Sequence, residues 1–228
     1  MDTSHKNTGK HGLIFVVSAP SGTGKTSLCR GVSEALGDLC YGVSYTTRPP
    51  RPGEVDGKDY FFVDEPTFQA RIAKNDLLEW AEVHGYLYGT SREAITSQTE
   101  HGMDVIIDVD PQGAMALKKK WSDGVYIYIL PPSFDALRER LMARRSDTED
   151  EIARRLQKAR EEIWNYRQYY YLIVNEDYKE ALKALTAIIV AERIKTKRMN
   201  FAWIEETFIK QLNKKEKDDP LVIANGNG

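Results

Sequence analysis

The sequence predicts an α/β fold whose core is a parallel sheet with helices on both faces. Two observations support this prediction. Short apolar runs rich in Val and Ile alternate with stretches of helical periodicity, and the first of these runs leads directly into a glycine-rich loop. Crossover connections between parallel strands are right-handed and place helices over the sheet. Ligands of such sheets bind at the carboxyl ends of the strands, so a site is expected there.

Continuous apolar runs predict four core strands, at 13–18, 103–109, 125–130 and 171–174. Apolar residues at helical spacing predict the helices. The first helix ends at Gly37, and Thr148 with Glu151 forms a capping box at the start of a later one. Further helices are expected at 66–73, 111–119, 133–142 and 177–195.

A stretch rich in Pro, Gly, Thr and Arg, 41–57, interrupts this alternation and has no helical period. A short strand at 60–63 follows it. Two more strands, 77–82 and 86–89, flank His84-Gly85 as the arms of a hairpin. We therefore expect a small, mostly β insertion at about 43–92, within a domain that spans 12–195.

The two ends of the chain are expected to lie outside this domain. Residues 1–11 are polar and predict a flexible leader, and the polar end of the extension 196–228 is expected to be disordered. Within that extension an apolar helical stripe would pack on the core or on another subunit, so a homo-oligomer is one expectation. The stripe consists of Phe201, Ile204, Phe208 and Leu212.

Composition narrows the class of protein. The 228 residues are 41% hydrophobic and 29% charged, with a net charge of −2, so no basic field exists that would attract nucleic acid or a membrane surface. The two cysteines, Cys29 and Cys40, fit neither a metal site nor a disulfide framework and indicate thiols in a reducing compartment. There is no apolar signal segment or membrane-spanning run. We expect a cytoplasmic protein that binds neither nucleic acid nor membranes.

The loop after the first strand, APSGTGKT, matches the phosphate-loop pattern at every required position except the first, where Ala19 replaces glycine. Glycines let the backbone N–H groups converge on phosphate oxygens, and the following helix adds its positive N-terminus. Lys25 would bind the β- and γ-phosphates, and the Thr26 hydroxyl would reach Mg²⁺. The predicted nucleotide ligands here are Ala19, Pro20, Ser21, Gly22, Thr23, Gly24, Lys25 and Thr26.

Two further pairs of charged residues indicate a second phosphate-binding site and the groups that would support it. Arg48 and Arg51 stand three residues apart in a loop stiffened by prolines, where their forked side chains can converge on one anion. Asp108 and Asp110 end the strand at 103–109, where an acid can organise Mg²⁺ and its waters or hold an acceptor-binding arginine.

Together these motifs resemble guanylate kinases. The stretches SAPSGTGKT, SYTTRPPRPGEVDGKDYFF, LLEWAEVHGYLYGT, VIIDVDPQGA and the arginine-rich segment after LPPS carry the resemblance, which covers roughly residues 11–195. It implies a P-loop kinase core, an insertion that binds the acceptor nucleotide and an arginine-rich lid at about 140–160. The implied reaction is the ATP-dependent phosphorylation of GMP, and of dGMP, with Mg²⁺.

The resemblance also implies roles for single residues. Arg48, Arg51, Tyr60 and Tyr88 resemble the ligands of the acceptor phosphate. Ser44 and Glu79 resemble the groups that read guanine, and Thr90, Asp108 and Asp110 resemble substrate-site residues beside them. Arg140, Arg144 and Arg155 resemble the lid arginines, and Asn175 a residue near the adenine. The catalytic set is then Lys25, Arg48, Arg144 and Arg155, with Arg140, Arg144 and Asn175 on ATP, Arg155 also on the acceptor, and Thr26 and Asp110 on the metal.

Guanine chemistry agrees with this assignment. One edge of guanine presents N1–H and N2–H₂ as donors, and a carboxylate at Glu79 can accept both. Adenine would leave that carboxylate unpaired, a difference worth about 10⁴–10⁵ in discrimination. No general base is expected, because a phosphate monoester is largely ionised near pH 7.

Three alternatives stay open. An inert scaffold with the same fold would have lost Lys25 and Thr26, which are intact. A GTPase switch would carry an N-K-x-D motif, which is absent from the sequence. A kinase for another monophosphate would differ at Ser44 and Glu79.

Overall fold

The computed structural model describes residues 11–83, 85–143, 148–198 and 201–210. The chain forms two compact units. His11–Glu192 is the larger unit and holds both sheets. The other consists of Met1–Lys10 and Arg193–Gly228.

The core is a five-stranded sheet in which every neighbouring pair is parallel. Its strands, in spatial order, are β2 (Leu39–Tyr41), β7 (Asp104–Val109), β1 (Ile14–Ser18), β8 (Val125–Leu130) and β9 (Tyr171–Val174). The four predicted strands are confirmed. The fifth strand, β2, was not predicted, because its three residues are too few to establish an apolar run or an alternation of apolar and polar residues.

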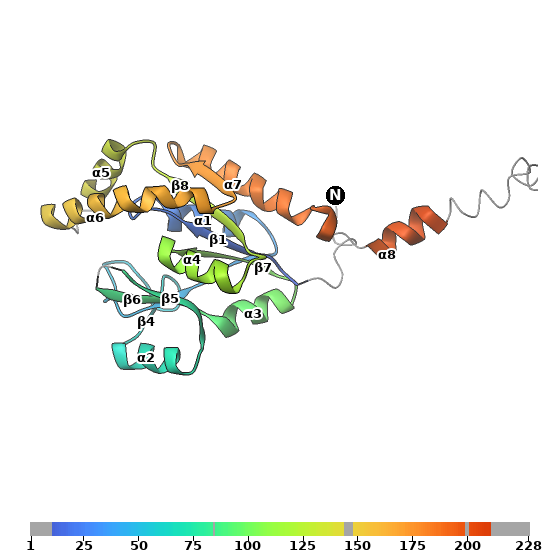
Figure 1. Cartoon of the computed structure of the whole chain (residues 1–228), viewed down its shortest axis with the longest axis horizontal. Helices are drawn as coiled ribbons and strands as arrows, with labels where there is room; N and C mark the ends of the chain where they lie inside the picture. Colours follow the sequence, from blue (N-terminus) through green and yellow to red (C-terminus); the bar gives the residue numbers. More distant parts are fainter. Residues whose placement is uncertain (1–10, 84, 144–147, 199–200, 211–228) are drawn as a thin grey trace, which may run out of the picture. The chain divides into compact units, whose positions relative to one another are not determined.

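Helices cover both faces of this sheet, as predicted (Figure 1). On one face α1 (Lys25–Ala35) and α7 (Tyr178–Arg193) pack on side chains such as Phe15 and Ile127. On the other face α3 (Arg92–Glu100) and α4 (Pro111–Lys120) pack on side chains such as Val16 and Ile107. Helix α3 was not predicted, because it buries only Ile95 and Thr99. Side chains of β1 and β7 thus lie in the hydrophobic clusters on the two faces of the sheet, and this packing holds both strands in place.

A second sheet of four strands lies within the interval predicted for the insertion. In spatial order its strands are β4 (Phe61–Phe62), β3 (Ser44–Thr46), β6 (Tyr86–Ser91) and β5 (Leu77–Val83), and α2 (Glu65–Ala73) follows β4. β5 and β6 are the predicted hairpin, whereas β3 was not predicted. Leu78 of β5 joins the core cluster on α4, so the two sheets are packed together.

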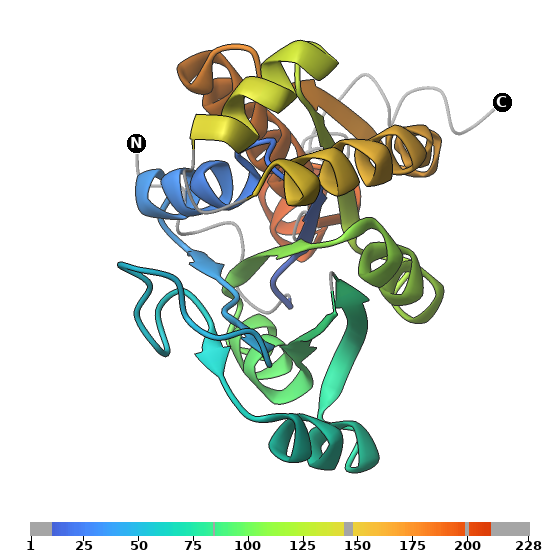
Figure 2. The same cartoon turned by 90° about the vertical axis from the view of Figure 1, so that its left-hand side faces the viewer.

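Helices α5 (Phe134–Ala143) and α6 (Glu149–Glu162) pack on each other through Leu137, Leu141 and Ala159. The predicted capping box is confirmed, because Thr148 and Glu151 hydrogen-bond each other's backbone. A 3₁₀ helix over Ile163–Gln168 follows α6 directly. Figure 2 shows this helix pair and the second sheet on opposite sides of the core.

The described part of the smaller unit contains a 3₁₀ turn (Thr196–Arg198), α8 (Phe201–Ile204) and a π-helical turn (Glu205–Ile209). Phe201 and Phe208 of the predicted stripe are half exposed. Leu212, the leader 1–10 and the polar end fall outside the described residues. Among the helices described, none has the length and apolar character to cross a membrane.

Candidate active site

The phosphate loop lies between β1 and α1, at the carboxyl end of the sheet. Gly22 and Gly24 have φ of 92° and 89°, which side chains rarely adopt, so the loop needs glycine at both positions. Thr23 closes it by donating from Oγ1 to the carbonyl of Pro20 at 2.6 Å. The segment thus forms the glycine-rich loop that the sequence pattern predicted. The loop begins at Ala19, which is buried.

Two predicted ATP ligands hold this loop from behind. Asn175 donates from Nδ2 to the carbonyl of Thr23 at 2.7 Å, and Arg140 donates to the same oxygen at 3.4 Å. Arg140 also donates to the carbonyl of Asn175 at 2.8 Å. Both side chains therefore position the loop backbone, and the contact of Asn175 with adenine stays a prediction.

Lys25, Thr26 and Asp108 meet at the ends of β1 and β7. Lys25 Nζ donates to the carbonyl of Val109 at 2.9 Å and lies 3.9 Å from an Asp108 oxygen. Thr26 donates to the same carboxylate, and Tyr41 donates to its other oxygen at 2.7 Å. Sequence reasoning missed Tyr41 because it lies on the short strand β2.

Asp110 caps the N-terminus of α4. Its Oδ1 accepts from the backbone N–H of Gly113 at 2.8 Å. Its other oxygen, Oδ2, is buried and has no hydrogen-bond partner among the described residues. A buried carboxylate oxygen without a partner is costly unless a cation or donor reaches it. This oxygen is therefore free to accept from a donor or to hold a cation or its water.

Ser44, Thr90 and Glu79 form a polar row across the second sheet, because Thr90 of β6 is the register partner of both of the others. Thr90 Oγ1 donates to Glu79 Oε1 at 2.7 Å and lies 3.4 Å from Ser44 Oγ. A register shift between Leu77 and Glu79 sets Leu78 toward the core and Glu79 into this row. All three side chains are buried.

The buried surroundings of Glu79 change how its carboxyl group titrates. Burial raises its pKa to about 7, which the hydrogen bond from Thr90 opposes and the charge of Asp110 reinforces. Its Oε2 lies where a side chain at position 113 would begin, since a Cβ on Gly113 would stand 2.4 Å from it. Helix α4 thus needs glycine there to admit the carboxylate.

The acceptor arginines differ in their contacts. Arg48 is buried and donates to Glu54 at 2.8 Å and to the Tyr88 hydroxyl at 3.2 Å. Burial tends to raise the pKa of Glu54, but the hydrogen bonds from Arg48 and the Arg51 backbone outweigh it and bring this pKa below its ordinary value. The carboxylate thus fixes Arg48, which also lies 5.5 Å from the ring centre of Tyr60. The side chain of Arg51 lines the pocket.

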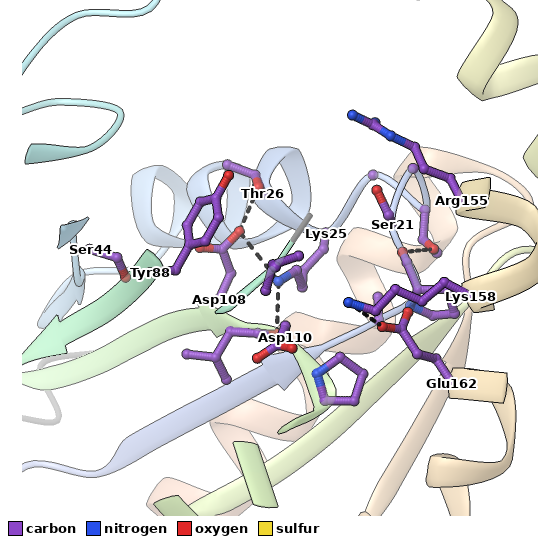
Figure 3. Close-up of a pocket in the computed structure, with 18 of the residues that line it drawn as sticks. Ser21, Lys25, Thr26, Ser44, Tyr88, Asp108, Asp110, Arg155, Lys158 and Glu162 are labelled. Carbon is purple, nitrogen blue, oxygen red and sulfur yellow. Dashed lines mark hydrogen bonds and ion pairs between the residues drawn. The ribbon is translucent and has the colours of Figure 1, made fainter. Parts of the chain in front are cut away.

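One pocket joins these groups, and Figure 3 shows Lys25, Asp108 and Asp110 between the second sheet and α6. The predicted residues that line it are Ala19, Pro20, Ser21, Gly22, Thr23, Gly24, Lys25, Thr26, Ser44, Arg51, Tyr60, Glu79, Tyr88, Asp108, Asp110 and Arg155. The predicted residues that are not part of that lining are Arg48, Thr90, Arg140 and Asn175, and Arg144 lies outside the described residues.

Lys158 and Glu162 also line the pocket and were not predicted. The available signal was their spacing. Lys158 follows Arg155 by three positions and Glu162 follows Lys158 by four, so the three side chains share one face of α6.

The known proteins that this chain resembles over most of its length are guanylate kinases. The guanylate kinase family model matches residues 12–192. A guanylate kinase from Geobacter sulfurreducens is 47% identical over 190 residues, covering 83% of this chain and 94% of that protein. One from Thermotoga maritima is 44% identical over 187 residues, covering 82% and 90%. A crystal structure of guanylate kinase from Anaplasma phagocytophilum matches with a TM-score of 0.74 at 33% identity, covering 88% of this chain and 96% of that chain.

Proposed function

The chain belongs to the guanylate kinase family, and we propose that the pocket at the carboxyl end of its core sheet is where a phosphoryl group passes from ATP to GMP. The protein is an enzyme, and its reaction is the ATP-dependent phosphorylation of GMP to GDP.

The donor side is the phosphate loop. Its backbone N–H groups and the N-terminus of α1 would bind the phosphates of ATP, and Lys25 would neutralise charge on the transferring group. Arg140 and Asn175 support this role through the carbonyl of Thr23, because a braced loop loses less entropy when it binds.

Mg²⁺ fits the residues next to this loop. The partnerless Oδ2 of Asp110 and the hydroxyl of Thr26 are oxygen ligands of the kind that Mg²⁺ prefers. We propose that these two residues hold the ion directly or through its waters. When bound, it would neutralise negative charge on the phosphates of ATP.

The acceptor side is the second sheet. Glu79, with Ser44 and Thr90 in the same row, would accept the N–H groups of guanine. Arg51, Tyr60 and Tyr88 would bind the GMP phosphate, and Arg48 would support them from behind. The proposed contacts are to the base and to the phosphate, and none of them involves the ribose 2′-hydroxyl that dGMP lacks. We therefore extend the proposal to dGMP.

Catalysis would then rest on positioning and charge neutralisation. The GMP phosphate oxygen is ionised near neutral pH and attacks without a general base. Arg155 lines the pocket beside the phosphate loop, where its guanidinium would stabilise the transferring group. We keep Arg144 in the same role and the segment 140–160 as a lid, by family resemblance. A cytoplasmic location accords with the free thiols of Cys29 and Cys40.

The deciding experiment measures ADP release from Mg·ATP with GMP, dGMP, AMP, UMP and dTMP. We expect turnover with GMP and dGMP and little with the others. Equal turnover with another monophosphate would contradict the guanine assignment. No turnover with any acceptor, in a protein that still binds ATP, would favour the scaffold alternative instead.

A further inference from the structure

A lysine–glutamate pair lies inside the pocket and has no role so far. Lys158 and Glu162 stand one helical turn apart on α6, with Nζ 3.5 Å from Oε1. Their side chains are only 25% and 11% exposed, and both line the pocket with Ser21 and Lys25. Figure 3 shows the pair beside the phosphate loop, on the helix that also carries Arg155.

The position of Glu162 needs an explanation. Burial raises the pKa of this carboxyl, the lysine opposes the shift, and the charge of Asp110 adds to it. A carboxylate in a site for nucleotide phosphates repels them unless a cation screens it. Lys158 is that cation in the structure described.

We propose that Lys158 is a further phosphate-binding residue for the donor nucleotide, held ready on Glu162. The inference rests on the proposed function. On nucleotide binding the ammonium turns from the carboxylate to a phosphate oxygen of ATP, while Glu162 positions it until then. Lysine suits this exchange, because its flexible stem carries a point charge that needs no fixed geometry.

The energetics favour the exchange. The distance of 3.5 Å between Lys158 Nζ and Glu162 Oε1 is longer than that of a good charge-assisted hydrogen bond, so the ammonium gives up little hydrogen bonding when it turns. A hydrogen bond from a cation to a charged phosphate is among the stronger ones in proteins. The pair is also next to the loop that would bind the phosphates, so the ammonium has only a short way to turn.

The variants to compare are Lys158→Gln, Glu162→Gln and the double variant, with KM for ATP and for GMP measured separately. Lys158→Gln should raise KM for ATP about tenfold and leave KM for GMP within about twofold. Glu162→Gln should leave KM for ATP unchanged or lower. Calorimetric titration with a non-hydrolysable ATP analogue, without GMP, should show the same order of affinities.

The double variant separates binding from screening. If Lys158 binds phosphate, its loss still costs about tenfold when Glu162 is already Gln. If it only screens Glu162, that cost disappears in the double variant, which would overturn the proposal. An increase in KM for GMP alone would also overturn it.

A matched control comes from α7. Lys183 and Glu180 form an exposed ion pair with a distance of 2.7 Å, and neither residue lines the pocket. Lys183→Gln should leave both KM values unchanged. If the parent enzyme turns over GMP but Lys158→Gln behaves like Lys183→Gln, the inference fails alone. If the parent shows no turnover with GMP, the proposed function fails.

Discussion

At the scale of single residues, we propose that Glu79 carries the specificity for guanine. A buried carboxylate is unfavourable without partners, and the structure gives Glu79 one side-chain donor, Thr90. Guanine would supply two more donors. The sequence alone favours a surface acid on an amphipathic strand at this position, and only the family resemblance pointed to the base. The structural reason is the register shift before Glu79, which a sequence pattern does not reveal.

The raised pKa of Glu79 predicts a pH dependence of GMP binding. Only the carboxylate form accepts both N–H groups of guanine, so protonation below a pKa of about 7 opposes binding. The dissociation constant of GMP, measured by titration without ATP, should rise about tenfold per pH unit below that value. The ionisation of GMP itself also contributes. In Glu79→Gln only that contribution should remain, and equal slopes in both proteins would contradict the prediction.

At the scale of elements, predictability followed the strength of the local sequence signal. The long strands, the phosphate loop and the short aromatic strand β4 could be predicted, because apolar runs and the Gly-Lys-Thr signature are local. Strands β2 and β3 could not, since neither lies in an apolar run as long as these and each is stabilised by pairing with distant segments. For the same reason the row of Ser44, Thr90 and Glu79 came from resemblance and not from pattern.

Helix α4 offers a test of how elements shape the site. Gly113→Ala would place a Cβ 2.4 Å from Glu79 Oε2, so the carboxylate or the helix must shift. Misplacing a binding group by about 1 Å can cost about a hundredfold in rate, and we expect kcat/KM for GMP to fall by that order. The same Cβ would stand 3.0 Å from Asp110 Oδ1, so KM for Mg·ATP should also rise, by less than kcat/KM for GMP falls. Crowding at this buried position should lower the free energy of unfolding by about 1–3 kcal/mol.

The matched control is Gly37→Ala, at a position where an added Cβ meets nothing within 4 Å. This variant should keep parental kinetics with both substrates. If Gly113→Ala also kept them, helix α4 would have no part in placing the carboxylate.

At the scale of the whole molecule, two sheets share one pocket. The core sheet brings the phosphate loop and the two aspartates, and the second sheet brings the groups proposed for the acceptor. The sequence predicted both sets. It did not predict the ion pair between Arg48 and Glu54 or the one between Lys158 and Glu162, because such pairs depend on side-chain placement in the folded chain.

The C-terminal extension allows a separate test of assembly. Its described part exposes Phe201 and Phe208, each about half accessible. If the helix that carries them joins two copies, light scattering should give the full chain a mass above that of one copy. A chain ending at Lys195 should then show a single-copy mass. If the full chain and the shortened chain contain the same number of copies in solution, the extension takes no part in an interface between copies.

The most direct test of the central claim compares Glu79→Gln with Glu82→Gln, an exposed position on the same strand. The measured quantity is kcat/KM for GMP and for AMP with saturating Mg·ATP. An amide cannot accept both N–H groups of guanine, so Glu79→Gln should lower the value for GMP by about 10²–10³ and leave KM for ATP unchanged. Glu82→Gln should match the parent. A Glu79→Gln enzyme that keeps parental selectivity for GMP would contradict the account.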